Sequence, residues 1–99
     1  YNWLPYVAAK SAVHAMSKNL AQELGPAGIT VNMVSPSLVD TDLVAGTPDR
    51  LRQAMVGRTP LRRLATVEDV AGAVLLLASP YARFVTGENL LVTGGDVML

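Results

Sequence analysis

The feature that most constrains this sequence is an alternation of helical and extended segments joined by short connectors. Residues 6–24 carry apolar side chains three and four positions apart, which predicts a helix with one apolar face: Ala9, Ala12, Val13, Met16, Leu20 and Leu24. Gly25-Pro26 predicts the end of that helix. Residues 29–34 alternate apolar with polar side chains and are rich in β-branched types, which predicts a strand a few residues later.

The same order returns after a longer excursion. Residues 35–60 are interrupted by prolines and glycines and predict a long loop with one short helix at 49–55, an arrangement that is often a functional lid. Thr66 and Asp69 have the spacing of a capping box, which predicts the start of a third helix that ends at Ser79-Pro80. Residues 90–92 form an apolar run between glycines and predict a buried strand. Alternating helices and strands imply crossover connections, so the fold class is α/β with a parallel sheet.

Composition excludes several classes of protein. Eight basic and eight acidic residues cancel, and no basic stripe suggests a nucleic-acid partner. There is no cysteine for a disulfide, a thiolate metal site or a nucleophile, which fits a cytoplasmic location. The longest apolar stretch, residues 71–78, is too short to span a bilayer. Two strands make no stable sheet alone, and the sequence begins with neither a signal peptide nor an initiator methionine. We therefore expect residues 1–99 to be part of a longer chain.

Tyr6 and Lys10 are the strongest candidates for catalytic residues in this sequence. They are four residues apart, so on a helix they lie one turn apart on the same face. A free tyrosine has a pKa of about 10, and a neighbouring ammonium group favours the tyrosinate and lowers that value. Such a pair can exchange a proton with a carbonyl or alcohol oxygen. The spacing alone also fits an exposed helix with an amphipathic tyrosine and a solvated lysine.

The surrounding segments separate these two interpretations, because together the chain resembles the short-chain dehydrogenase/reductase family over nearly its whole length. The matching segments, in family order and spacing, are Tyr6-Val7-Ala8-Ala9-Lys10, Gly28-Ile29-Thr30-Val31-Asn32, Pro36-Ser37-Leu38-Val39-Asp40-Thr41, Arg63-Leu64-Ala65-Thr66-Val67-Glu68-Asp69-Val70-Ala71 and Thr86-Gly87-Glu88-Asn89-Leu90-Leu91-Val92-Thr93-Gly94-Gly95. The resemblance implies the C-terminal half of one Rossmann-type domain over residues 1–99, a doubly wound parallel sheet in three α/β/α layers. Its N-terminal half, with the Gly-rich phosphate turn and the catalytic serine, would be missing.

The resemblance also implies roles for individual residues. Tyr6 would be the general acid/base, and Lys10 would lower its pKa and hydrogen-bond the nicotinamide ribose. Pro36, Ser37, Val39 and Thr41 would contact the cofactor, with the backbone of Val39 at the carboxamide. Ser37 stands where the family commonly has glycine, which restricts the backbone there, and Thr93 replaces an aspartate that we interpret as structural. The cofactor would be NADP or NAD, with NADPH favoured.

The single histidine and three arginines are weaker candidates for a functional role. His14 is the single histidine and follows Lys10 by one turn, but it has no partners at ligand spacing, so we expect a surface or interface residue and no metal site. Arg58, Arg62 and Arg63 could attract an anionic substrate or carrier, although a solvated loop face is the simpler interpretation.

Three hypotheses for function follow. In the first, the protein is an NAD(P)-dependent oxidoreductase, most similar to the β-ketoacyl-carrier-protein reductase type, that interconverts a carbonyl and a secondary alcohol, with an acyl-carrier-linked substrate possible and a homodimer or homotetramer as the assembly. In the second, it is a non-catalytic relative that serves as a binding or scaffolding subunit. In the third, it is an independent small domain of unrelated function. Neither a nucleic-acid nor a membrane partner is expected.

Overall fold

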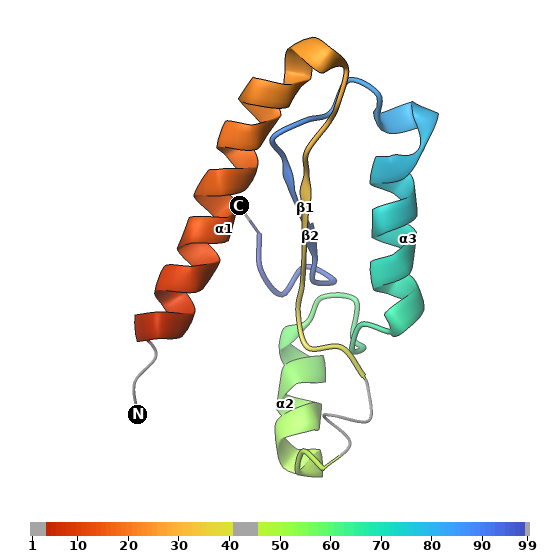
Figure 1. Ribbon diagram of the computed structural model, residues 1–99. Helices are drawn as coiled ribbons and strands as arrows, with labels where there is room; N and C mark the ends of the chain where they lie inside the picture. Colours follow the sequence, from red (N-terminus) through yellow and green to blue (C-terminus); the bar gives the residue numbers. More distant parts are fainter. Residues whose placement is uncertain (1–3, 41–45, 99) are drawn as a thin grey trace.

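The computed structural model describes residues 4–40 and 46–98, without the side chain of Tyr6. The described residues form three α-helices and two strands (Figure 1), in the order α1 (Leu4–Leu24), β1 (Met33–Pro36), α2 (Asp49–Arg58), α3 (Val67–Ala78) and β2 (Asn89–Val92), with short 3-10 helices at Gly25–Ala27 and Pro80–Ala82. The two strands are parallel, with Met33 opposite Asn89 and Pro36 opposite Val92. The predicted α/β class, with its crossover between parallel strands, is confirmed.

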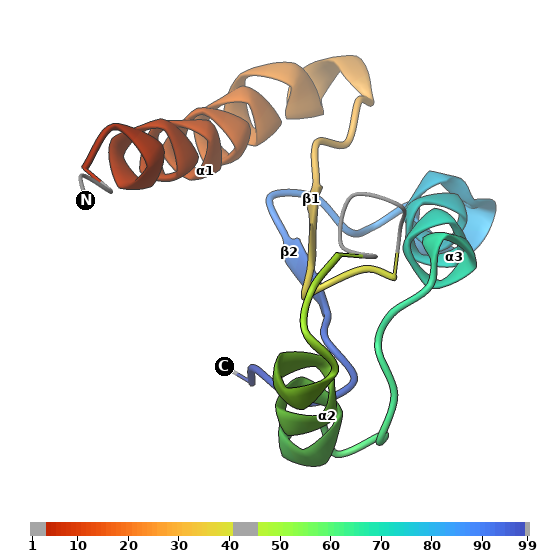
Figure 2. The same ribbon diagram turned by 90° about the horizontal axis from the view of Figure 1, so that it is seen from below.

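The helices cover different sides of this strand pair. α3 packs against both strands, and α1 lies on another side of them, where its C-terminal half approaches the loop before β2 (Figures 1 and 2). The Lys18 ammonium donates to the Gly87 carbonyl at 3.4 Å in that region. α2 lies beyond the carboxyl ends of both strands (Figure 1), which is the end where parallel α/β sheets bind ligands.

The first strand lies later in the chain than predicted, at Met33–Pro36 instead of 29–34. Over the earlier residues the Gly87 N–H donates to the Val31 carbonyl at 2.8 Å, and side chains make the other links. Thr86 Oγ1 accepts from the Val31 N–H at 3.0 Å, and the Asn32 amide donates to Val85 O and accepts from the Glu88 N–H, both at 3.0 Å. The regular ladder begins only where the Met33 N–H reaches the Glu88 carbonyl at 2.8 Å.

The helix ends have local causes. α2 continues past the predicted end at residue 55 to Arg58, and stops at Thr59, whose extended backbone suits the residue before Pro60. α3 has the predicted capping box, because the Thr66 hydroxyl accepts from the Asp69 N–H at 3.2 Å and the Asp69 carboxylate accepts from the Thr66 N–H at 2.8 Å. Its acidic first turn also complements the helix dipole.

The apolar helix faces predicted from the sequence are present but largely uncovered. Within residues 4–40 and 46–98 no large side chain is fully buried, and the buried apolar residues are Ala21 and Ala82. Exposed apolar side chains line both outer helices: Val13, Met16 and Leu20 on α1, and Val74, Leu75 and Leu76 on α3. No helix in the described ranges is both long and apolar enough to cross a membrane.

Candidate functional site

The two predicted acid/base residues share one uninterrupted helix. Tyr6 and Lys10 lie in the first half of α1, one helical turn apart. The side chain of Tyr6 lies outside the described part of the structure. Lys10 lines an open hollow of about 390 Å³, together with Val13 and His14 of α1 and with Met33, Val34 and Ser35 of β1. The lysine therefore faces the strand whose end carries the other predicted residues.

The chain after β1 is attached to two other segments. Pro36 is the last residue of the strand, and the Ser37 N–H donates to the Val92 carbonyl at 3.2 Å. Val39 forms an isolated parallel bridge with Ala65, closed by the Asp40 N–H donating to the Ala65 carbonyl at 2.8 Å. These bonds fix residues 37–40, which we call the strand-end segment, against β2 and the loop before α3.

The bridge leaves the peptide groups of Val39 available. In a parallel bridge closed through the N–H of Asp40, the N–H and C=O of Val39 itself point to the opposite side. In the part of the chain that the structure describes, neither group makes a backbone hydrogen bond. Val39 is half-buried. It thus presents one donor and one acceptor side by side, which matches the needs of a primary amide.

The substitution at Ser37 proves harmless to the backbone. Arg62 is the one non-glycine residue of the described ranges with a positive φ, so Ser37 lies where any L-residue is accommodated. Thr41, the last of the predicted cofactor contacts, lies outside the described residues.

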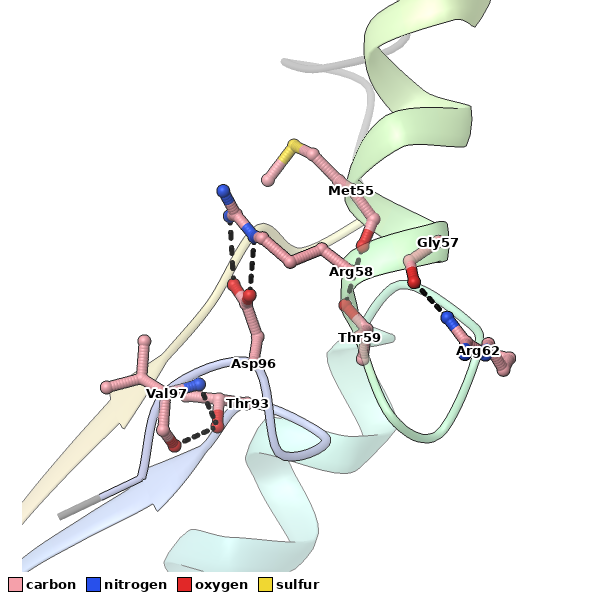
Figure 3. Close-up of polar contacts among 8 residues, drawn as sticks. All are labelled: Met55, Gly57, Arg58, Thr59, Arg62, Thr93, Asp96 and Val97. Atoms are coloured by element: carbon pink, nitrogen blue, oxygen red, sulfur yellow. Dashed lines mark hydrogen bonds and ion pairs between the residues drawn. The ribbon is translucent and has the colours of Figure 1, made fainter.

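Helix α2 lies in the segment predicted to form a lid, and it is attached near both of its ends. Arg52 donates to the Asp40 carboxylate at 2.8 Å, which ties the helix to the strand-end segment. Arg58 makes two bonds to the Asp96 carboxylate, at 2.6 and 3.1 Å, and the Asp96 side chain is only 9% exposed (Figure 3). The C-terminal end of α2 is therefore fixed to the segment that follows β2.

A turn over residues 59–62 strengthens this second attachment. The Leu61 N–H donates to the Gly94 carbonyl at 3.1 Å, and the Thr59 hydroxyl donates to the Met55 carbonyl at 2.8 Å. Arg62 has φ 59°, and its guanidinium donates to the Gly57 carbonyl at the end of α2 (Figure 3). Gly95, with φ 91°, lies so near Pro60 that the turn and the double glycine form one packed unit.

All three arginines considered as anion attractors have partners within the chain. Arg58 pairs with Asp96, Arg62 donates to Gly57, and Arg63 makes two bonds to the Asp69 carboxylate at 2.5 and 3.0 Å. Hydrogen bonds from the Arg63 guanidinium and from the Thr66 backbone hold the pKa of Asp69 well below its usual value. The Asp96 carboxylate likewise raises the pKa of Arg58. These arginines stabilise the frame of the lid and the start of α3.

Two minor predictions concern His14 and Thr93. His14 is half-buried in the hollow beside Lys10. Among residues 4–40 and 46–98 no group of three or more histidine, aspartate or glutamate side chains could hold a metal ion. Thr93 is buried, and its hydroxyl donates to the Val97 carbonyl at 2.9 Å and accepts from the Val97 N–H at 3.4 Å (Figure 3). The structural interpretation of Thr93 is thereby supported.

Sequence reasoning missed the polar links of the lid. Arg52, Asp40 and Asp96 carry no local motif, since Arg52 and Asp40 are 12 residues apart and Arg58 and Asp96 are 38 apart. The one local signal was the short helix predicted at 49–55, which contains Arg52 but does not identify its partner.

Comparison with known proteins agrees with this architecture. A family model described as "Enoyl-(Acyl carrier protein) reductase" matches residues 1–96. The chain is 40% identical over 94 residues to the 3-oxoacyl-[acyl-carrier-protein] reductase of Vibrio cholerae, which is 95% of this chain and 38% of that protein. It is 45% identical over 89 residues to a 3alpha-hydroxysteroid dehydrogenase of Mediterraneibacter gnavus, 90% of this chain and 36% of that protein.

Solved structures show the same fold. A 3-oxoacyl-[acyl-carrier protein] reductase from Brucella melitensis superposes with a TM-score of 0.88 at 40% identity, over 95% of this chain and 35% of that one. A short-chain dehydrogenase/reductase from the same organism superposes with a TM-score of 0.89 at 35% identity, over all of this chain and 40% of that one. The chain thus spans well under half the length of these relatives, and its sequence and Rossmann-type fold both show that it belongs to the short-chain dehydrogenase/reductase family.

Proposed function

We propose that the protein is an NAD(P)-dependent oxidoreductase that interconverts a ketone, such as a 3-oxoacyl group, and a secondary alcohol. The observation that carries this proposal is the pairing of Tyr6 and Lys10 one turn apart on a helix whose Lys10 faces β1, in a chain that belongs to this family. Relatives named as 3-oxoacyl-[acyl-carrier-protein] reductase and 3alpha-hydroxysteroid dehydrogenase act at an oxygen-bearing carbon of this kind.

The residues of this chain would handle the proton. In the reducing direction the Tyr6 hydroxyl gives its proton to the carbonyl oxygen as that oxygen gains negative charge, and in reverse the tyrosinate removes it from the alcohol. The Lys10 ammonium stabilises the tyrosinate by its charge. A bound nicotinamide supplies or accepts the hydride at the substrate carbon. The oxygen that changes charge would therefore lie at the N-terminal half of α1.

The strand-end segment fits such a cofactor. A nicotinamide carboxamide needs one acceptor and one donor, and Val39 presents both beyond the carboxyl end of β1. Lys10 would hydrogen-bond the ribose, Pro36 and Ser37 would shape the turn beside the ring, and Thr41 would complete the contacts. Between the two forms of the cofactor, NADPH is the one that we favour.

The exposed surfaces support a larger assembly. β1 is paired on one side only among the described residues, and the hollow over Met33, Val34 and Ser35 leaves room for a further strand. We therefore include in the proposal that residues 1–99 are the C-terminal half of a single Rossmann-type domain. The uncovered apolar side chains of α1 support assembly as a homodimer or homotetramer. The proposal also includes an acyl-carrier-linked substrate and a cytoplasmic location.

Replacing Tyr6 with phenylalanine tests the proposal in the complete protein. Tyr6→Phe removes the proton donor but keeps the ring, so we expect NADPH-dependent reduction of a 3-oxobutanoyl thioester to fall by at least about 100-fold, with NADPH binding nearly unchanged. Tyr81→Phe is a matched control, because Tyr81 is 91% exposed at the far end of α3. Undiminished turnover in Tyr6→Phe would remove the tyrosine from the mechanism.

A further inference from the structure

We propose that Arg52 is a positioning residue, which couples the lid helix α2 to the strand-end segment 37–40 through the Asp40 carboxylate. This inference rests on the proposed function, because the segment matters only if Val39 receives a cofactor. The pair joins two elements that have separate roles: one carries the free peptide groups of Val39, and the other covers the carboxyl ends of the strands.

The strand-end segment is short and firmly held on one side. The Asp40 N–H bonds to Ala65 at 2.8 Å and the Ser37 N–H bonds to Val92 at 3.2 Å, so two backbone bonds bracket Val39. The Asp40 side chain turns to α2 instead and accepts from Arg52 at 2.8 Å. A change in the backbone around Val39 therefore reaches α2 through the next residue, Asp40, and the ion pair that Asp40 makes with Arg52.

α2 is held differently at its two attachments. At its C-terminal end the Asp96 side chain is 9% exposed and accepts two bonds from Arg58, while the turn at 59–62 adds a backbone bond to Gly94. Nearer its N-terminal end Arg52, 24% exposed, donates to Asp40, 52% exposed. Although Arg58 is itself 64% exposed, its partner carboxylate is nearly buried and a backbone bond holds the same end of the helix, whereas water reaches the half-exposed Asp40 carboxylate and competes for it. The C-terminal attachment is thus the fixed point, and the Asp40–Arg52 pair is the releasable one.

This arrangement predicts reciprocal effects. A cofactor amide bound at Val39 holds Asp40 in place, which favours the ion pair and the seated position of α2, and a seated α2 favours the bound backbone in turn. The two also lie along one open hollow of about 660 Å³, lined by α2 and the loop before α3, in which Asp40 and Arg52 are neighbours. A partly exposed ion pair supports a coupling of about two- to five-fold in affinity.

Amide hydrogen exchange in the complete protein measures this coupling. We expect NADPH to slow exchange in peptides covering residues 49–58 of the wild type, and to slow it much less in Arg52→Gln, whose NADPH dissociation constant should rise about two- to five-fold. Arg50→Gln is the matched control, since Arg50 is exposed, lies in the same helix and takes part in neither ion pair. Arg52→Lys, which keeps the charge, should restore part of the effect.

A double-mutant cycle separates coupling from general damage. If the pair acts as a unit, Asp40→Asn and Arg52→Gln combined should raise the dissociation constant no more than either change alone. Additive effects, or wild-type protection of α2 in Arg52→Gln, would overturn the inference while leaving the proposed function intact. A wild type that bound neither NADPH nor NADH would overturn both. A thermal midpoint for Arg52→Gln close to that of Arg50→Gln would show that the fold is retained.

Discussion

Replacing Gly95 with alanine puts a methyl group against a proline ring, in a turn that already requires a positive φ. Gly95 has φ 91°, and a Cβ built on its backbone comes within 2.8 Å of Pro60 Cγ, 3.1 Å of Cβ and 3.2 Å of Cδ. Carbon atoms in favourable contact are about 3.5–4.0 Å apart. The proline ring cannot rotate away, because it is closed onto the backbone of the turn that ends α2.

Two costs add in this variant. An L-residue with left-handed backbone costs about 1–2 kcal/mol relative to glycine, and φ 91° lies beyond the centre of that region. An extra methyl group in a filled site costs about 1–3 kcal/mol more. We therefore expect Gly95→Ala to lower the free energy of unfolding by about 2–5 kcal/mol.

Gly28→Ala is the control that isolates the first cost. Gly28 has φ 78°, and a Cβ there meets nothing within 4 Å among the described residues, so the loss should be about 1–2 kcal/mol. Urea unfolding of the complete protein, followed by circular dichroism, gives both values. Equal losses in the two variants would refute the packed contact between the double glycine and the turn at 59–62, because the contact is the difference between them.

Three further outcomes are expected. Arg62→Gly should be more stable to urea than Arg62→Ala by about 1 kcal/mol, since both lose the bond to Gly57 but only glycine relieves φ 59°; the reverse order would contradict that strain. The pKa of Asp69 is lowered in the folded state, so its contribution is present above the unfolded value of about 3.9 and is lost as pH falls through the folded value. The urea midpoint of wild type should thus exceed that of Asp69→Asn at pH 7, and the gap should begin to narrow below about pH 4 and close only near the lowered folded value. A gap that stayed constant as the pH fell below about 4 would contradict this. Sedimentation of the complete protein should give a dimer or tetramer, and a monomer at micromolar concentration would argue against the exposed face of α1 as an interface.

Local patterns allowed most of the elements to be predicted. The capping box at Thr66 and Asp69 depends on residues three apart, and the helix over Tyr6 and Lys10 depends on apolar spacing within one segment. The hydrogen bonds of the Asn32 side chain could not be predicted, because its amide bonds to Val85 and Glu88, which are more than 50 residues away in the sequence. Because these distant partners decide where β1 begins, the strand predicted at 29–34 lies a few residues before the observed Met33–Pro36.

The candidate site divides in a similar way. Pro36 and Val39 were assigned through family likeness, and the bridge to Ala65 supplies a physical reason, since it turns the peptide groups of Val39 outward. The links that hold the lid came only from the structure. Arg58 was considered for attracting an anion, yet it is occupied by the nearly buried Asp96, a residue in the last few positions of the described chain.

The backbone attachments at the two ends of the lid make it an exchangeable insert. The bond from Asp40 to Ala65 and the bond from Leu61 to Gly94 secure the chain before and after residues 41–60, while the register of β1 with β2 depends on neither. Insertions between two secured points leave a sheet undisturbed. Variation in length and sequence between these points can therefore alter which substrates the protein accepts while the frame stays the same. A chimaera that transplants residues 41–57 from another family member, and so keeps Arg58 as the partner of Asp96, should keep the host's fold.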